Sequence, residues 1–138
     1  MACAWVDGAA RGNPGEAGFG VVVEHGGREE EIGGFLGRTT NNVAEYAALL
    51  AALGWAAREG IDTLTLYSDS ELVVRQLAGQ YRVKAPHLIP LFLKVLTLRR
   101  AIPRFRIEHV PREQNRRADA LANRAIDERL PVPDWVEL

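Results

Sequence analysis

Residues 43–57 are almost wholly apolar and read Val-Ala-Glu-Tyr-Ala-Ala-Leu-Leu-Ala-Ala-Leu-Gly-Trp-Ala-Ala. Strong helix formers dominate it, so we expect a helix that is buried between other elements. A few residues later, residues 63–68 read Thr-Leu-Thr-Leu-Tyr-Ser and alternate as a half-buried strand does. A buried helix that leads directly into a strand is typical of an α/β sheet.

Three strands are expected before this helix. They cover residues 2–7, 17–25 and 28–36. Turn-forming residues fill 8–15, and Gly26-Gly27 is a two-residue hairpin signal. The first third of the chain therefore predicts an antiparallel meander.

Further elements follow the strand at 63–68. We expect helices over 70–78, 86–100 and 115–129, a strand over 104–110, and a tail over 130–138 that packs on the body. Strands 1, 4 and 5 are separated by helices, so they should run parallel through right-handed crossovers. The prediction is one α/β domain over 1–138, a five-stranded mixed sheet with helices on both faces.

Composition narrows the class of protein. The chain has 138 residues, of which 47% are apolar and 25% charged, the ordinary globular balance. No apolar run reaches the roughly 18 residues of a membrane span, and the N-terminus does not resemble a signal peptide. Cys3 is the one cysteine, which excludes an internal disulfide. We expect a cytoplasmic monomer without membrane contact.

The net charge of −1 conceals an uneven distribution. Residues 1–71 carry 11 acids and 4 bases, whereas residues 72–107 carry 8 bases and no acid. The total alone argues against a polyanionic partner. The base-only segment is either a solvated helix face or a surface for nucleic-acid phosphates.

Four carboxylates stand at positions that favour a common site. Asp7 and Asp69 end strands 1 and 4, and ligands bind beyond the carboxyl ends of such strands. Glu45 is the only charged residue from 43 to 57, and Asp119 lies in the first turns of the last helix. Each also has a structural interpretation: turn capping for the aspartates at strand ends, a capping box with Asn42 for Glu45, and a helix-dipole charge for Asp119.

Oxygen ligands of this kind suit Mg²⁺ or Mn²⁺ better than zinc. Two such ions about 4 Å apart would orient a water and stabilise both oxygens of a phosphoryl displacement. Two divalent ions would also change the net charge to about +3.

Four ordered motifs then resemble one family, the type 1 ribonucleases H. They are D-G-A-A-R-G-N-P-G at 7–15, T-T-N-N-V-A-E-Y at 39–46, Y-S-D-S-E at 67–71 and V-P-R-E-Q-N-R-R-A-D-A-L-A at 110–122. The resemblance covers about residues 2–128. It implies an endonuclease that cuts the RNA strand of RNA–DNA hybrids and leaves 5′-phosphate and 3′-hydroxyl ends.

The resemblance also assigns roles to residues. It implies two Mg²⁺ ions, with Mn²⁺ as a possible substitute, held by Asp7, Glu45, Asp69 and Asp119. It implies contacts with the minor groove of the hybrid from Gly12, Asn13, Asn41 and Asn42, where 2′-hydroxyls distinguish RNA from DNA. Thr40 matches a position near a DNA-strand phosphate, and Glu71 stands where relatives often have Gln.

Two departures from the family pattern matter. Many relatives carry a histidine in a loop before the last aspartate; here either His109 or Arg112 could take that place. We favour Arg112, with His109 inside a strand. We also expect neither the basic protrusion of some relatives nor a separate hybrid-binding domain; Arg82, Lys84 and His87 would be a partial substitute for the protrusion.

The sequence is also compatible with two other functions. A non-catalytic nucleic-acid-binding module could use the same fold, although all four carboxylates are present. A related nuclease could instead act on DNA, although the Gly-Asn-Pro-Gly loop and Asn41-Asn42 favour the hybrid.

Overall fold

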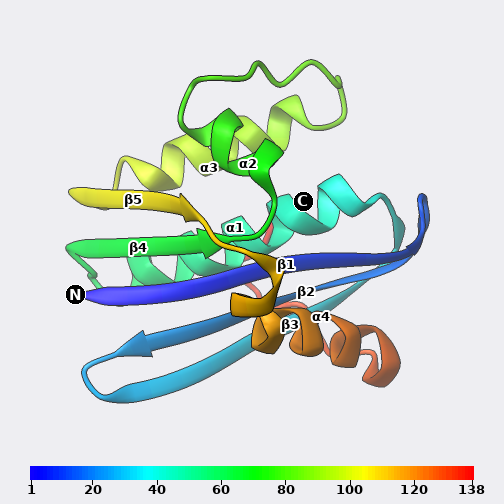
Figure 1. Ribbon diagram of the computed structural model, residues 1–138, viewed down its shortest axis with the longest axis horizontal. Coiled ribbons are helices and arrows are strands. Elements are labelled where there is room, and N and C mark those ends of the chain that lie inside the picture. Colours follow the sequence, from blue (N-terminus) through cyan, green and yellow to red (C-terminus); the bar gives the residue numbers. More distant parts are fainter.

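The five strands form one mixed sheet in the order β3-β2-β1-β4-β5, as Figure 1 shows for the computed structural model of residues 1–138. The strands are β1 (Ala2–Gly12), β2 (Gly15–His25), β3 (Arg28–Thr39), β4 (Thr63–Ser68) and β5 (Arg104–His109). The first three pair antiparallel, and β4 lies parallel to both β1 and β5. The predicted fold class and strand directions are confirmed.

Helices cover both faces of the sheet. They are α1 (Asn41–Arg58), α2 (Glu71–Leu77), α3 (Ile89–Arg99) and α4 (Arg116–Glu128), with a short 3-10 helix η1 (Arg112–Gln114) before α4. α1 lies behind the sheet in Figure 1 and α4 in front of it, over β1, β2 and β3. α3 packs on α1, and α2 packs on β4 and β5.

The main core lies between the sheet and α1. Ala4 and Val6 of β1, Val21 of β2, and Leu49 and Leu53 of α1 are all buried in one apolar cluster. α1 is buried along most of its length, which agrees with its apolar sequence. This core fixes the position of α1 relative to β1, and the candidate site depends on that position.

Two glycines bring the helices close to the sheet. A Cβ on Gly8 would lie within 2.8 Å of three backbone atoms of Ala44 and Glu45 in α1. A Cβ on Gly20 would lie within 2.9 Å of atoms of α4, the carbonyl oxygen of Ala118 among them. Gly20 pairs with Asp7 across β1 and β2, so both close approaches occur next to the same aspartate.

The first three strands are all longer than predicted. The sequence predicts a turn over 8–15, but β1 continues to Gly12 and pairs with β2 as far as Gly15. Only Asn13 and Pro14 form the turn, and the bond between them is cis. Turn-forming residue types do not prevent a strand when a neighbouring strand satisfies their backbone groups. Asp7 therefore lies inside β1 and does not end it.

Two helices begin elsewhere than predicted. α1 begins at Asn41, and the hydroxyl of Thr40 caps it by accepting a hydrogen bond from the Val43 amide. Asn42 is therefore not the N-cap, and Glu45 belongs to no capping box. α3 begins at Ile89 and not at residue 86; Pro90 lies in its first turn, where the missing N–H costs no hydrogen bond.

The tail packs on α1 as expected. The indole N–H of Trp135 donates to the Ala51 carbonyl at 3.0 Å, and the guanidinium of Arg58 lies 4.7 Å from the ring centre. Gly54 leaves the space that the indole ring fills. No helix of the chain has both the length and the apolar character that crossing a membrane requires.

Candidate active site

The register of the parallel strands brings two aspartates together. The ladder between β1 and β4 ends at the pair Val6–Ser68. The next residues along the chain are Asp7, still within β1, and Asp69, the first residue after β4. β4 stops there, whereas β1 continues toward the hairpin with β2. Because β4 ends while β1 continues, no strand covers β1 on the β4 side beyond Asp7, and a cleft opens there. The site lies at the carboxyl ends of the parallel strands, as the sequence predicts.

Glu45 reaches the same place from α1. It lies in the second turn of that helix, and the absence of a side chain on Gly8 lets the helix backbone come close to β1. Asp7 and Glu45 are both only 5% exposed, and Asp69 is half-buried. Carboxylate oxygens of Asp7, Glu45 and Asp69 lie within 4.8 Å of one another.

Asp119 completes the group of four from α4. It faces Asp7 closely enough for a side-chain hydrogen bond between the two. All four carboxylates line one cleft of about 500 Å³, together with Asn41, Ser70, Arg112, Asn123 and the backbone of residues 8–10. The structure thus brings together the four acidic residues that the sequence singles out.

Burial and mutual repulsion change the acidity of this cluster. Burial, followed by the charges of Glu45 and Asp69, raises the pKa of Asp7 to about 9. Burial and the charge of Asp69 raise the pKa of Glu45 to about 8. Burial also raises the pKa of Asp69, against a side-chain hydrogen bond from Asn115 and the positive charge of Arg112. A cation bound between carboxylates this close together would offset their mutual repulsion and stabilise their ionised forms.

The donor set fits a hard divalent cation. Every close side-chain donor of the cluster is a carboxylate oxygen, which suits Mg²⁺ or Mn²⁺ and leaves no soft ligand for zinc. A bound cation would favour the ionised carboxylates and reverse the rise in pKa.

The hairpin turn and the start of α1 form one rim of the cleft. The Asn13 side-chain oxygen accepts a hydrogen bond from the backbone amide of Asn41 at 3.0 Å. Gly12 has φ +104°, a conformation that suits glycine. Asn41 lines the cleft, whereas Asn42 is exposed and does not line it. Of the predicted minor-groove residues, Gly12, Asn13 and Asn41 lie together at this rim.

Arg112 and His109, the two candidate basic residues before α4, lie in different places relative to the cleft. Arg112 is the first residue of η1 and lines the cleft. His109 is the last residue of β5, is exposed, and does not line the cleft. The position of His109 within a strand is as predicted. Glu71 lies at the start of α2 and pairs with Arg75 at 2.7 Å, outside the cleft lining.

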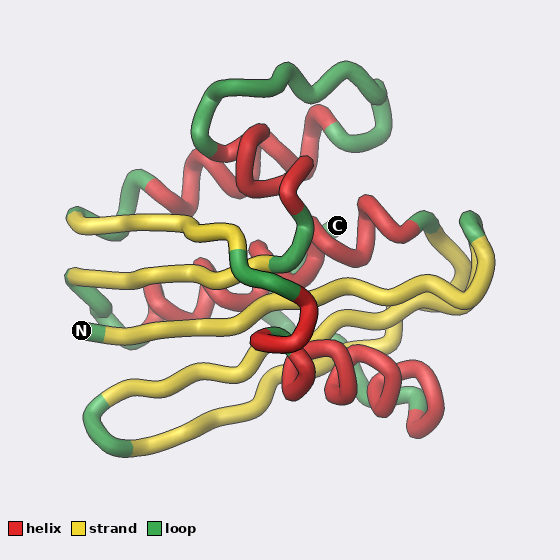
Figure 2. Tube along the Cα trace, viewed as in Figure 1, coloured by secondary structure: helices red, strands yellow, loops and turns green.

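The base-only segment is divided by the fold. Arg75, Arg104 and Arg106 each form an ion pair with a carboxylate, and Arg99 donates to the Leu77 carbonyl. Arg82 and Lys84 are exposed on the loop between α2 and α3, the long loop at the top of Figure 2. Lys94 also donates to the Glu137 carbonyl at 3.1 Å. The segment is therefore not a uniform basic surface, because five of its eight bases are already engaged.

Two site residues have no role assigned from sequence. Asn115 is buried immediately before α4 and donates from its side chain to the Val6 carbonyl at 2.9 Å, next to Asp7. Asn123 lines the cleft one turn after Asp119. The i,i+4 spacing from Asp119 would have placed Asn123 on the same helix face. Asn115 lies in the motif at 110–122, but only the fold shows that its side chain is buried beside β1.

A five-stranded mixed sheet between helices, with an acidic cluster where the parallel strands end, defines the class of ribonuclease H-like domains. A family model described as "Reverse transcriptase-like" matches residues 5–125. The chain belongs to the type 1 ribonuclease H family.

Relatives of known name support this membership. The chain is 46% identical over 127 residues to the ribonuclease HI of Halobacterium salinarum, covering 91% of this chain and 64% of that protein. It is 37% identical to a ribonuclease H of Alkalilimnicola ehrlichii, covering 91% and 94% of the two chains. The chain spans only 34% of the length of several mycobacterial relatives.

A solved structure with a similar fold contains a nucleic acid. LC11-RNase H1 in complex with an RNA/DNA hybrid is 43% identical and superposes with a TM-score of 0.86, covering 93% of this chain and 98% of that one.

Proposed function

We propose that this chain is an endonuclease that hydrolyses the RNA strand of RNA–DNA hybrids, with two Mg²⁺ ions, and leaves 5′-phosphate and 3′-hydroxyl ends. One observation carries the proposal: four carboxylates from β1, α1, β4 and α4 converge in one open cleft whose rim is formed by Asn13 and Asn41. Relatives named ribonuclease H, and the hybrid bound to LC11-RNase H1, support the choice of substrate.

The acidic residues would hold the metal. Asp7 interacts with all three other carboxylates, by charge with Glu45 and Asp69 and by a hydrogen bond with Asp119, and so is suited to serve both ions. Glu45 and Asp69 would then help to hold one ion, and Asp119 the other. When bound, the metal supplies an activated water and charge stabilisation at the phosphate. Arg112, which also lines the cleft, adds a positive charge near Asp69 and can balance the charge of a bound phosphate.

The rim would position the substrate. Asn13 and Asn41 are held against each other by a hydrogen bond, so the hairpin tip and the start of α1 present one joined surface. Amide groups and backbone atoms there can reach 2′-hydroxyls and base edges in a minor groove. The exposed Arg82 and Lys84 can contact the phosphates of the opposite strand.

A single set of gels tests the proposal. One labelled RNA strand is presented in hybrid, in duplex RNA and in single-stranded form, with Mg²⁺, Mn²⁺ or EDTA. We expect metal-dependent cleavage of the hybrid, and complete loss of cleavage in Asp69→Asn with hybrid binding retained. Asp62→Asn, which removes an exposed carboxylate paired with Arg104, is the matched control and should cut normally.

Three results would contradict the proposal. An active Asp69→Asn protein would exclude this mechanism. Binding of the hybrid without cleavage in either metal would indicate a binding module. Cleavage of a DNA duplex in preference to the hybrid would indicate a nuclease with another substrate.

A further inference from the structure

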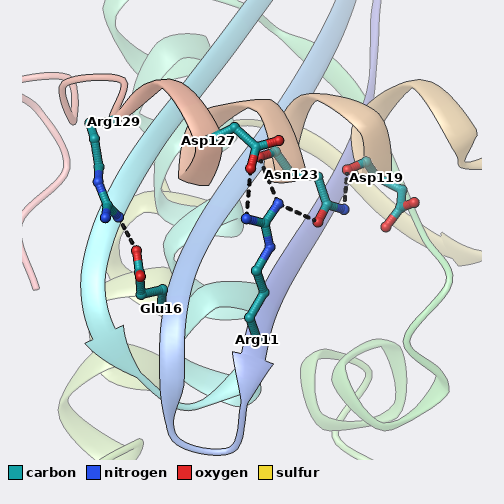
Figure 3. Close-up of polar contacts among 6 residues, drawn as sticks. All are labelled: Arg11, Glu16, Asp119, Asn123, Asp127 and Arg129. Carbon is teal, nitrogen blue, oxygen red and sulfur yellow. Dashed lines mark hydrogen bonds and ion pairs between the residues drawn. The ribbon is translucent and has the colours of Figure 1, made fainter.

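A chain of polar contacts ties the substrate rim to the helix that carries Asp119 (Figure 3). Arg11 precedes Gly12 at the end of β1, and its guanidinium extends to α4. Nη1 donates to the Asp127 carboxylate at 2.6 Å. Nη2 lies 3.4 Å from both the backbone oxygen and the side-chain oxygen of Asn123. One side chain of the hairpin therefore contacts two successive turns of α4.

Asn123 continues the chain toward the carboxylate cluster. Its side-chain nitrogen donates to the Asp119 carbonyl at 3.1 Å, while its side-chain oxygen faces Arg11. The amide group is thus held at both ends, and its orientation is determined by its neighbours. Asn123 also lines the cleft together with Asp119.

The contact between Arg11 and Asn123 repeats, further along β1 and α4, the contact between Asp7 and Asp119 in the acidic cluster. Asp7 and Arg11 are four residues apart in a strand, so they lie on the same face of β1. Asp119 and Asn123 are four residues apart in a helix, so they lie on the same face of α4. The contact of Arg11 with Asn123 and that of Asp7 with Asp119 therefore join the same strand to the same helix, at successive positions.

A second ion pair joins β2, the other strand of the hairpin, to the end of α4. Glu16 of β2 stands directly opposite Arg11 in the strand register and pairs with Arg129 at the end of α4. The pairing with Arg129 lowers the pKa of Glu16, and the pairing with Arg11 lowers that of Asp127. This second pair touches neither Asn123 nor the cleft, so it provides a comparison within the same interface.

We propose that Arg11 and Asn123 are positioning residues that set the orientation of the Asp119 carboxylate relative to Asp7, and so tune the affinity of the acidic cluster for a divalent cation. The inference deepens the proposed function and rests on it. Neither residue touches the cation; Arg11 acts on Asn123, and Asn123 acts on the helical turn that bears Asp119. Because Arg11 adjoins Gly12 and Asn13, the same contact links the substrate rim to the cluster.

Exposed ion pairs contribute little to folding stability, so the effect of these residues should appear in metal affinity and not in the thermal midpoint. Groups that orient metal ligands typically change affinity by about 10- to 100-fold when they are replaced. Arg11 is partly exposed, so we expect a value near the lower end of that range.

The variants Arg11→Met and Asn123→Leu test the proposal. They keep side-chain bulk and remove the polar groups. Mn²⁺ binding to the whole protein without nucleic acid, measured by calorimetry, should weaken by roughly 10-fold in each. In hybrid cleavage, the Mg²⁺ concentration for half-maximal rate should rise by a similar factor, and kcat at limiting Mg²⁺ should fall more than KM rises. The double variant should lose little more than either single variant, because both act through one contact.

Three further variants distinguish a role in orienting Asp119 from a role that only holds the hairpin against α4. Arg129→Met removes the second ion pair of the hairpin, and Arg58→Met removes an exposed pair with Asp134 at the tail. Both should bind Mn²⁺ as the parent does. Arg11→Lys keeps the charge opposite Asp127, but a single ammonium cannot also bridge to Asn123, so it should restore only a minor part of the affinity.

Unchanged Mn²⁺ affinity in Arg11→Met and Asn123→Leu would overturn the positioning role, and so would an equal loss in Arg129→Met. A parent protein that fails to cut the hybrid while these two variants still bind Mn²⁺ more weakly would contradict the proposed function and leave the positioning role intact.

Discussion

Gly8 of β1 lies directly against the backbone of Glu45 in α1, with no space between them for a Cβ atom. The strand and the helix can approach this closely only because residue 8 has no side chain. The contact places a buried glutamate next to Asp7, from the opposite side of the strand to α4. The glycine after the first aspartate is therefore part of what assembles the acidic cluster.

Replacing this glycine should damage the site and the fold together. Gly8→Ala would push α1 away from β1, which we expect to destabilise the protein by about 1–3 kcal/mol, the usual cost of overpacking. Mn²⁺ binding should weaken strongly because Glu45 moves. Gly27→Ala is the control: residue 27 has φ +77° but open space around it, so it carries only a backbone penalty and should leave Mn²⁺ binding unchanged. Thermal unfolding and calorimetry measure both effects; parent-like metal binding in Gly8→Ala would refute this account.

Stability without metal should fall as the pH rises from 6 to 9. The pKa of Asp7 in the folded protein is about 9 and that of Glu45 about 8, whereas both groups titrate near 4 when unfolded. The folded state therefore holds more protons in this interval, and its stability declines as those protons are lost. The contribution is complete below about pH 4 and disappears as the pH passes the folded-state values. Glu16 and Asp127, whose pKa values are lowered, are ionised in both states above pH 6.

Thermal midpoints in EDTA and in Mg²⁺ check this prediction. The midpoint in EDTA should decrease from pH 6 to pH 9, and the gain from Mg²⁺ should increase over the same range. Asp7→Asn, measured in EDTA, should show a weaker dependence on pH because it removes one of the two groups. Equal slopes for the parent and Asp7→Asn would show that Asp7 does not titrate in this range.

Arg112 and His109 should differ in their effect on hybrid cleavage. Arg112 lines the cleft, and its charge partly opposes the rise that burial causes in the pKa of Asp69, so Arg112→Ala should reduce kcat by on the order of 10-fold through lost charge stabilisation. His109 ends β5 outside the cleft, and His109→Ala should stay within about twofold of the parent because distant surface changes have small effects. Steady-state kinetics on a hybrid distinguish the two residues, and Arg112→Lys tests whether charge alone suffices. A larger loss in His109→Ala would reverse the assignment.

Local sequence patterns predicted most helices and strands well, because the formation of these elements depends largely on residues that are neighbours in the chain. The apolar run at 43–57 and the alternation at 63–68 identified α1 and β4, and the helices between strands identified the parallel pairs. The ends were less predictable. Residues 8–12 contain turn formers, yet the hydrogen bonds of β2 hold them in a strand. Pairing with a distant segment is not a local property, so composition alone misplaced this boundary.

The candidate site was predictable to a similar degree. Asp7, Glu45, Asp69 and Asp119 could be selected from strand ends, from an isolated charge and from the family resemblance. The contributions of Arg11, Asn115 and Asn123 could not, because each depends on which groups the sheet and α4 bring opposite one another. Gly8 is similar, since only the approach of α1 shows why its size matters.

Salt dependence should reveal which bases contact the nucleic acid. The exposed Arg82 and Lys84 lie on the loop between α2 and α3, whereas Arg104 and Arg106 already pair with Asp62 and Glu108. The affinity for a hybrid, measured in EDTA across a range of salt concentrations, should fall linearly on a log–log plot.

Each phosphate contact that is lost should reduce the slope of this plot by about 1, so the double variant Arg82→Ala/Lys84→Ala should reduce it by about 2. Arg104→Ala/Arg106→Ala is the matched control with the same change in net charge, and it should leave the slope near that of the parent because these guanidinium groups are engaged by carboxylates. Equal slopes in the two double variants would mean that general charge, and not the α2–α3 loop, governs binding. A smaller slope only in the control would place the nucleic acid along β5 instead.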